Sequence, residues 1–274
     1  MKTLEKKRLV DANNVAECMN ELSLVRGLNH RLICNGHFAF QDACLLYLVL
    51  DIAMASDLRV NIGLVKLMKT HFTLEQIQYI MGSVILALEY CHSQNVLHRD
   101  IKPDNILLEE RGTFMLADFG ISKKVDDATN PTTCRSTSGT PGYAAPEIKA
   151  KVGHGVPSEC YSCGILLQEL VCLLEVPQVP PKLLLPSEAT DWCTAEMKDF
   201  VAEATRVDPL VRMGSKNMVS EVKEDAPLCA PILPSVRPIS PPFSLLPLTS
   251  PPNTRFACAD GRRQGAPFVR RLPL

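Results

Sequence analysis

The sequence predicts an α+β fold in which short strands come first and helices dominate the rest of the chain. Residues 37–41 and 45–50 are runs of aromatic and aliphatic residues that are typical of two short strands. Residues 73–91 carry a long amphipathic pattern and residues 164–174 an almost wholly apolar one, which is typical of two helices. A polar-interrupted link at residues 51–57 separates the two kinds of element and is a candidate hinge.

Composition argues against several classes of partner. The chain has 274 residues, 46% of them hydrophobic, and a formal net charge of −1, so it can bury a sizeable core. A charge this close to zero gives no electrostatic reason to expect nucleic acid or an anionic membrane as a partner. The apolar run at residues 164–174 contains Gln168 and Glu169 and is too short to span a bilayer.

The 11 cysteines are expected to be reduced. The charged N-terminal segment has no apolar signal core, which favours a cytoplasmic or nuclear location over an oxidising compartment. Cys160 and Cys163 have the spacing of a zinc or redox pair, but no second pair follows, and zinc needs four ligands. We therefore expect both to pack in the core. His92 and His154 have no visible partners in the sequence and are expected at the surface.

Two helix starts can be identified from capping residues. Asn14 can cap a helix, and apolar residues recur behind it at helical spacing. These residues are Val15, Met19, Leu22 and Val25. Thr73 and Gln76 form a capping-box pattern that begins the amphipathic helix at residues 73–91. That helix leads the chain directly to residue 98.

The most informative stretch is HRDIKPDNILL at residues 98–108. It carries a base, a cation and a metal ligand in one loop, and two further motifs follow it: LADFG at residues 116–120 and GTPGYAAPE at residues 139–147. Four residues of these motifs form a set that could orient a hydroxyl and hold nucleotide-bound magnesium. They are Asp100, Lys102, Asn105 and Asp118.

In this order and spacing, the three motifs resemble those of a eukaryotic protein kinase. Lys102 and GTPGYAAPE indicate a serine/threonine kinase, and FAFQDACLLYLVLDIAMASDLR resembles the AGC group, most nearly its YANK branch. The resemblance covers residues 1–222 and implies a two-lobed α+β kinase fold. Residues 1–52 would form an incomplete N-lobe and residues 53–222 a mostly helical C-lobe.

The remaining residues, 223–274, are expected to form a disordered tail. Eleven of the chain's 21 prolines lie from Ala226 onward, without a helical or alternating pattern. A proline-rich tail can bind SH3 or WW domains, but a linker is the expected role.

The resemblance implies transfer of the γ-phosphate of ATP, with Mg²⁺, to serine or threonine hydroxyls of proteins. Asp100 would accept or orient the proton of the substrate hydroxyl, because a carboxylate stays ionised at neutral pH. Lys102 would neutralise charge on the transferring phosphate. Asn105 and Asp118 would offer the hard oxygen ligands that magnesium prefers.

The resemblance also assigns a nucleotide site. Lys2 and Glu21 are nineteen residues apart, as the strand lysine and helix glutamate of AGC kinases are, so Lys2 is expected at the α- and β-phosphates. A solvated N-terminal lysine is the alternative. The other residues assigned to nucleotide are the gatekeeper Leu50, the Asp51 carbonyl, the Ala53 N–H, Asp57 at the ribose, Asp104, and Leu107 beneath the base.

Four residues are expected to regulate the site. Arg99 precedes Asp100 and implies control by phosphorylation of the activation loop by an upstream activating kinase. Lys123 is a candidate second cation, and Ser136, three residues before the glycine of GTPGYAAPE, matches the AGC phosphosite. Thr140 is expected to bridge Asp100 and Lys102.

In the C-lobe the resemblance has one match and two departures. Arg212 ends the segment DPLVR and is expected to pair with Glu147, the glutamate of APE. Glu159 replaces the aspartate that anchors the catalytic loop, and Tyr161 replaces a neighbouring tryptophan. Residues 176–192 are also short and proline-rich compared with other kinases.

In the N-lobe the glycine-rich loop is absent from the sequence, and Gly36 stands where kinases have a large apolar residue. We expect Gly36 to leave a gap beside the helix of Glu21. These departures keep two alternatives open: a kinase-fold scaffold, or pseudokinase, that binds partners without catalysis, and a truncated inactive fragment.

Overall fold

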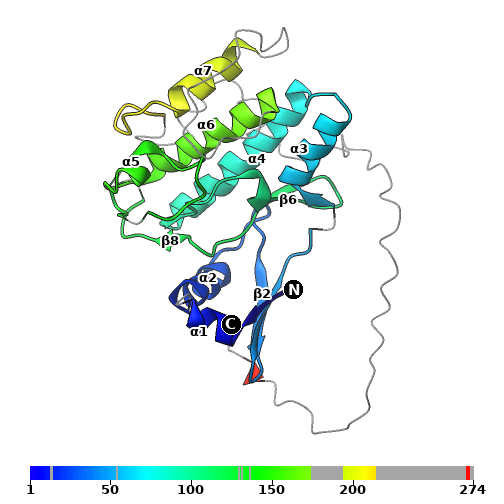
Figure 1. Cartoon of the computed structure of the whole chain (residues 1–274), viewed down its shortest axis with the longest axis vertical. Coiled ribbons are helices and arrows are strands. Elements are labelled where there is room, and N and C mark those ends of the chain that lie inside the picture. The colour runs from blue at the N-terminus through cyan, green and yellow to red at the C-terminus, as the bar shows by residue number, and fades with distance from the viewer. Residues whose placement is uncertain are drawn as a thin grey trace.

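The described part of the chain has a small lobe built on a sheet and a larger helical lobe, as the computed structural model in Figure 1 shows. The described residues are 1–12, 15–53, 55–128, 130, 132–135, 137–173, 194–213 and 270–271. The predicted α+β fold is confirmed, with the longest strands before residue 52 and the longest helices after it. Residues 176–192, Asn14 and almost all of the proline-rich tail lie outside the described residues.

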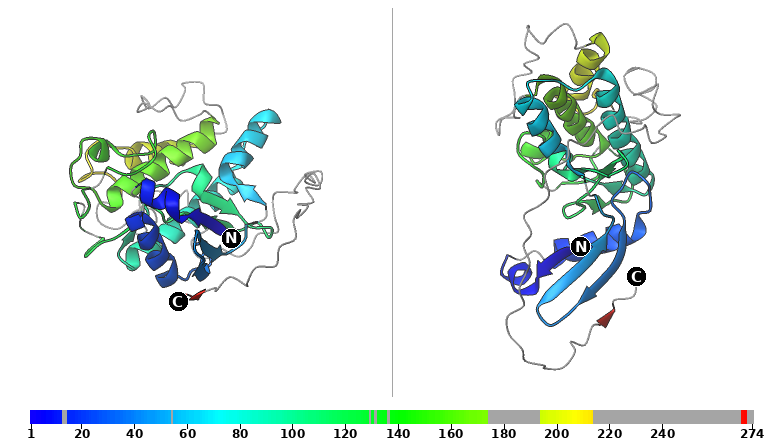
Figure 2. Two further views of the ribbon diagram at one scale, coloured as in Figure 1. Left: turned by 60° about the horizontal axis from the view of Figure 1, so that its bottom comes forward. Right: turned by 90° about the vertical axis from the view of Figure 1, so that its right-hand side faces the viewer.

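The small lobe is an antiparallel sheet flanked by two helices (Figure 2). Its elements are β1 (Lys2–Glu5), α1 (Lys6–Asp11), α2 (Val15–Gly27), β2 (Gly36–Gln41), β3 (Leu45–Leu50) and β9 (Arg270–Arg271). The strand order is β1-β3-β2-β9, and Lys2 pairs with Leu48. Phe40 of β2 faces Tyr47 of β3, and their rings stack with centroids 4.6 Å apart. The β3 strand has the bounds that its aliphatic run predicts.

The buried face of α2 differs from the predicted one. Leu22 and Val25 are buried, but Val15 and Met19 are exposed. Cys18 takes part in the core instead, in a cluster with Leu22 and the sheet. The helical period was therefore recognised correctly, but the buried face of α2 runs through Cys18, Leu22 and Val25 and leaves Val15 and Met19 exposed.

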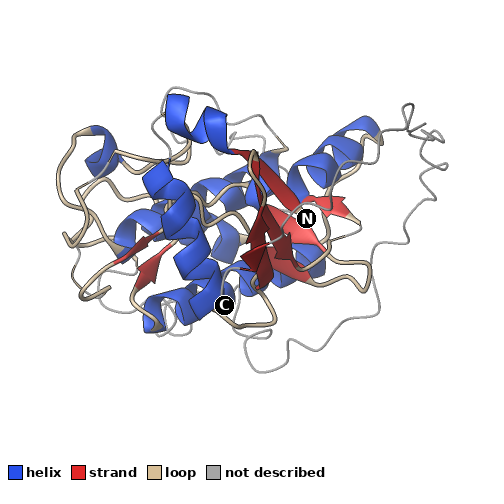
Figure 3. Cartoon of the chain, turned by 90° about the horizontal axis from the view of Figure 1, so that it is seen from below, coloured by secondary structure: helices blue, strands red, loops and turns tan. Residues whose placement is uncertain are grey.

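The large lobe is built around two long helices, α4 and α6 (Figure 1). Figure 3 shows from below that helices make up much of the described chain. Its helices are α3 (Leu58–Leu67), α4 (Leu74–Ser93), η1 (Pro103–Asn105), α5 (Pro146–Lys149), α6 (Val156–Cys172) and α7 (Ala195–Ala204). Its short strands are β4 (Ser56–Asp57), β5 (Val96–Leu97), β6 (Ile106–Leu108), β7 (Phe114–Leu116) and β8 (Lys123–Lys124). The capping box of Thr73 and Gln76 is present. None of the described helices is long and apolar enough to cross a membrane.

Helix α6 is the central helix of this lobe, since nearly all of its residues are buried. Cys160 and Cys163 lie in its buried interior, as predicted. Gly164 lets α7 approach closely, because a Cβ there would lie 2.7 Å from Thr205 Cγ2 and 2.9 Å from Ala204 Cβ. At position 164 the two helices therefore leave no space for a side chain.

The two lobes meet at Leu50, the last residue of β3, which packs against both the large and the small hydrophobic core. The β4-β6-β7 sheet lies on the large-lobe side of this junction. The chain segments that carry the predicted site residues therefore converge where the lobes meet.

Candidate active site

The catalytic loop begins at a buried histidine. His98 donates from Nε2 to the Ala117 carbonyl over 3.0 Å, and the Ser122 hydroxyl donates to the His98 carbonyl over 3.0 Å. Ala117 and Ser122 flank the DFG motif at residues 118–120. These bonds hold the catalytic loop against the DFG segment, although the two are separate in the sequence.

Glu159 of α6 anchors the loop from the core. Its Oε1 accepts the backbone N–H of Arg99 over 2.6 Å, and its Oε2 lies 2.5 Å from His92 Nε2. Burial alone would raise the pKa of Glu159, but the bond to His92 and the charges nearby lower it below its ordinary value. Arg99 has φ +70°, a conformation that costs energy and needs such support. Glutamate therefore still anchors the loop in place of aspartate.

Both histidines that the sequence placed at the surface lie in the interior. The side chain of His92 is mostly buried and forms an ion pair with Glu159 when protonated, and His154 is fully buried. The sequence carried a weak signal for His92, its place in the last turn of a predicted helix. It carried none for His154, which is buried because residues 134 and 154 form a backbone bridge.

Asp100 is held by Thr140 and Lys102. Its Oδ1 accepts the Thr140 hydroxyl over 2.6 Å and the Thr140 N–H over 3.0 Å, and its Oδ2 lies 2.8 Å from Lys102 Nζ. Lys102 also donates to the Thr140 hydroxyl over 2.8 Å, so Thr140 contacts both residues. Burial alone would raise the pKa of Asp100, but the hydrogen bonds from Lys102 and Thr140 lower it. The carboxylate is therefore ionised and fixed in direction.

Asn105 and Asp118 form a pair of oxygen donors beside Asp100. The Asn105 amide nitrogen donates to the Asp100 carbonyl over 2.8 Å and to its carboxylate over 3.0 Å, which turns the amide oxygen away from Asp100. The Asn105 carbonyl accepts the N–H of Ala117, the residue before Asp118. Asp118 has φ +63°, and about half of its side chain is exposed.

This donor set fits magnesium, which takes few protein ligands and prefers hard oxygens. One amide oxygen and one exposed carboxylate, on adjoining segments, leave room for phosphate oxygens and water. Among the described residues, no group of three or more His, Cys, Asp or Glu side chains could hold a metal, so a dedicated protein cage is not formed in this part of the chain.

Lys2 and Glu21 are brought together across the small lobe. Lys2 Nζ lies 2.7 Å from Glu21 Oε1 and 3.2 Å from Asp118 Oδ1, so it links α2 to the DFG motif. Burial alone would lower the pKa of Lys2, but its bonds to Glu21 and Asp118 raise it. Glu21 is buried, whereas 35% of the Lys2 side chain is exposed. The lysine is charged and points into the junction between the lobes.

The family comparison agrees with this geometry. A family model with the description "Protein kinase domain" matches residues 1–222. The chain belongs to the protein kinase family.

Curated relatives are named as serine/threonine kinases. The cAMP-dependent protein kinase catalytic subunit of Dictyostelium discoideum is 36% identical over 171 residues, which is 62% of this chain and 25% of that protein. The RAC family serine/threonine-protein kinase homolog of the same organism is 29% identical over 227 residues, 80% of this chain and 50% of that protein. Human serine/threonine-protein kinase 32B is 33% identical over 176 residues, 62% of this chain and 41% of that protein.

The names of the last two relatives agree with the serine/threonine kinase of the AGC group that the sequence motifs resemble. The chain spans half or less of the length of these three relatives.

The residues assigned to the adenine and ribose line the junction, but most of their polar groups have protein partners. The Asp51 carbonyl, which was the group assigned to adenine, lies 3.7 Å from Cys34 Sγ, and the Asp51 carboxylate accepts from the N–H and amide of Asn35. Asp57 caps α3, because its carboxylate accepts a backbone N–H of the first turn over 2.8 Å. Two further assigned residues, Leu50 and Leu107, are half-buried, as a surface that receives a planar ring requires. Contact of these residues and of Ala53 with a nucleotide stays a prediction.

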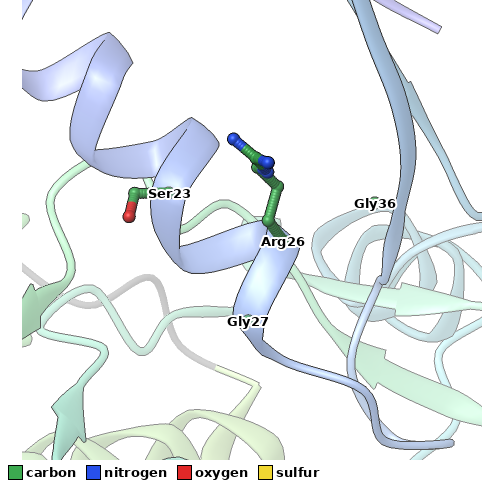
Figure 4. A pocket seen from close by; sticks show the side chains of 4 residues that line it. All are labelled: Ser23, Arg26, Gly27 and Gly36. Carbon is green, nitrogen blue, oxygen red and sulfur yellow. The ribbon is translucent and has the colours of Figure 1, made fainter. Parts of the chain in front are cut away.

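Val25 fills the centre of the gap that was predicted at Gly36. A Cβ on Gly36 would lie 2.2 Å from Val25 Cγ1, so Val25 occupies the space that a side chain would need. An open pocket of about 350 Å³ remains at the surface, lined by Ser23, Arg26, Gly27 and Gly36 (Figure 4). The expected gap beside the helix of Glu21 is therefore present only as this open pocket at the surface, because α2 packs its own valine against the glycine.

The expected regulatory site is described only in part. The Arg99 guanidinium donates to the Ile121 carbonyl and lies 3.5 Å from Cys134 Sγ. Lys123 is exposed on β8, and Ser136 lies outside the described residues. Control by phosphorylation of Ser136 stays a prediction.

The C-lobe pair of Arg212 and Glu147 is formed and buried. Two parallel bonds of 2.6 and 2.9 Å join the guanidinium to the carboxylate, and the Arg212 Cζ lies 5.2 Å from the ring centroid of Tyr161. Tyrosine in place of tryptophan thus still offers an aromatic face to the cation.

Sequence reasoning missed Arg59. It binds Asp104, Glu169 and Tyr143, all of them close to the catalytic loop or to the GTPGYAAPE segment. The Asp104 carboxylate, which was assigned to nucleotide, has this arginine as its partner. No spacing rule connects Arg59 with Glu169, because the two are 110 residues apart.

Proposed function

We propose that this chain transfers the γ-phosphate of ATP to serine or threonine hydroxyls of protein substrates, with Asp100 as the residue that receives or orients the hydroxyl proton. The observation that carries the proposal is the fixed, ionised carboxylate of Asp100, held by Lys102 and Thr140. A hydroxyl that donates to this carboxylate has its oxygen lone pairs directed outward, toward a phosphate.

The neighbouring residues supply positioning and charge. Lys102 lies between Asp100 and Thr140, where it neutralises charge on the transferring phosphate. Asn105 and Asp118 hold magnesium, which when bound neutralises the phosphate oxygens. Lys2, fixed by Glu21, binds the α- and β-phosphates. Each of these residues orients reactants, and orientation of this kind supplies much of the rate of phosphoryl transfer.

One observation favours the second candidate, a kinase-fold protein that binds partners without turnover. Within the described residues, β1 is the edge strand of its sheet, and Lys2 lies at its start. An edge strand is paired on one side only and frays more easily than a central strand. If fraying of β1 lets Lys2 move, both nucleotide affinity and turnover would be lower.

Thermal melting with and without Mg-ATP, combined with phosphate transfer to a mixture of serine and threonine peptides, tests the proposal. A ligand that binds the folded state raises the melting temperature. A raised melting temperature with transfer that Asp100→Asn abolishes supports the kinase. A raised melting temperature without transfer supports the scaffold, and a chain without a cooperative melt is an inactive fragment.

The substrate proteins, an upstream activating kinase and a cytoplasmic or nuclear location are part of the same proposal. They rest on the family and on the reduced-cysteine argument from the sequence.

A further inference from the structure

Arg59, the second residue of α3, joins three segments of the large lobe. Its Nε and Nη2 each lie 3.3 Å from Asp104 Oδ2, and its Nη2 lies 2.7 Å from the Tyr143 hydroxyl. Its Nη1 donates to Oε1 of Glu169 on α6, and the Tyr143 hydroxyl donates to the other oxygen of the same carboxylate. One guanidinium therefore serves two carboxylates and one phenol.

The burial of these groups explains why a cation is needed. The Glu169 side chain is 0% exposed, whereas Asp104 is 51% exposed and Arg59 35%. A buried carboxylate is costly unless a hydrogen-bonded cation accompanies it. Burial alone would lower the pKa of Arg59, but its bonds to Tyr143 and Glu169 raise it. Without Arg59 the cluster would hold two carboxylates and no cation.

The cluster lies beside the catalytic residue. Asp104 belongs to η1, in the same loop as Asp100, and Tyr143 belongs to the segment whose Thr140 bonds to Asp100. Asp104 and Arg59 are both partly exposed there. A peptide that brings its hydroxyl to Asp100 must therefore pass next to this cluster with its neighbouring side chains.

We propose that Arg59 is a specificity-determining residue. It fills a carboxylate site beside Asp100, and without Arg59 this site would bind an arginine or lysine of the substrate. The chain then accepts serine and threonine peptides without selecting basic neighbours, because a basic side chain there meets the Arg59 guanidinium. This inference rests on the proposed kinase function. The planar guanidinium suits this site because its N–H donors are arranged to bind carboxylates. When Arg59 is removed, we therefore expect an arginine of the substrate to take its place.

The test compares serine peptides that carry arginine or glutamine at each position flanking the serine. The proteins are the unaltered chain, Arg59→Ala, and the matched control Lys66→Ala, which removes one positive charge from the same helix. We expect Arg59→Ala to prefer arginine peptides by about tenfold or more at one or two positions, which is the discrimination expected of a hydrogen bond to a charged group. The unaltered chain and Lys66→Ala should show no such preference. In Arg59→Ala/Glu169→Gln the preference should disappear.

Binding of the same peptides with alanine in place of serine, measured by fluorescence anisotropy, separates this inference from the proposed function. An arginine preference in binding by Arg59→Ala, together with no phosphorylation by the unaltered chain, would support the inference about the Arg59 site and refute the proposed activity. Phosphorylation with no preference in a folded Arg59→Ala would overturn the inference alone, as would an equal preference in the unaltered chain. If Arg59→Ala does not melt cooperatively, Arg59→Gln, which keeps a donor for Glu169, answers the same question.

Discussion

Two ion pairs of this kinase, Lys2–Glu21 in the small lobe and Arg212–Glu147 in the large lobe, resemble each other in chemistry and differ in setting. The Lys2 side chain is 35% exposed and starts an edge strand, whereas the Arg212 and Glu147 side chains are 0% and 4% exposed. Arg212 also donates to the carbonyls of Pro157, Arg206 and Val207. The comparison indicates that the buried pair maintains the fold, and that the exposed pair is available to a ligand.

The largest effect is expected from breaking the buried pair. Arg212→Met should lower the free energy of unfolding by roughly 3–5 kcal/mol, because it leaves the Glu147 carboxylate buried without its cation. Urea unfolding followed by circular dichroism measures this loss. The control Arg206→Met removes an exposed ion pair with Glu203 and should cost about 1 kcal/mol or less. Equal losses in the two variants would show that the buried pair is not the support that its geometry suggests.

Asp100→Asn should affect turnover and leave the fold intact. The amide keeps the shape but removes the anionic acceptor, so the rate of phosphate transfer should fall by roughly two or more powers of ten. ATP affinity, measured by the melting-temperature shift, should change little. The exposed control Asp199→Asn on α7 should retain full activity. Unchanged transfer by Asp100→Asn would remove Asp100 from the mechanism.

Lys2→Met should separate ligand binding from stability in the small lobe. Loss of a partly exposed ion pair should cost at most about 1 kcal/mol of unfolding free energy. Loss of a cation that binds phosphate should weaken Mg-ATP affinity by about tenfold or more. Titration of the melting temperature with Mg-ATP measures affinity, and Lys7→Met, at an exposed position of α1, serves as the control. A variant that binds Mg-ATP normally would mean that Lys2 only links α2 to the DFG motif.

The smallest effect concerns pH. Burial lowers the pKa values of His98 and His154, so the unfolded chain takes up protons near pH 6.5 and the folded chain does so only at lower pH. The free energy of unfolding should therefore fall as pH decreases through about 6.5. The groups that face His154 are Arg99, which opposes its protonation, and Glu147 and Glu159, which favour it.

The pKa values of Asp100 and Glu159 are lowered in the folded state. Their contribution to stability is present above about pH 4 and is lost below that value, as pH falls through their folded-state pKa values. Urea titrations at pH 7, 5.5, 4 and about 3 distinguish the two ranges. His154→Leu should flatten the pH dependence between 7 and 5.5, and an unchanged slope would contradict the assignment to this histidine.

Local sequence patterns located the elements with the clearest patterns, which are α2, β2, β3, α4 and α6, although α6 begins at Val156, before its apolar run. The β3 strand and the capping box of α4 follow from composition and from contacts within four residues, which a sequence displays directly. The α2 helix was recognised, but its buried face was not, because that face depends on where the sheet lies. The gap at Gly36 was predicted correctly only in part for the same reason: Val25, from a helix that precedes Gly36, fills its centre and leaves an open pocket at the surface.

The sequence by itself determined the family, the lobes and the set of candidate catalytic residues, since Asp100, Lys102 and Asn105 lie within six positions of one loop. Only the tertiary structure decided how that loop is supported and what surrounds it. Glu159 reaches Arg99 across 60 residues, and Arg59 reaches Glu169 across 110. Such contacts leave no periodicity in the sequence, because they arise where helices from distant segments pack against one another. A buried carboxylate needs a hydrogen-bonded partner in the interior, and the packing of the helices decides which donor lies close enough to serve.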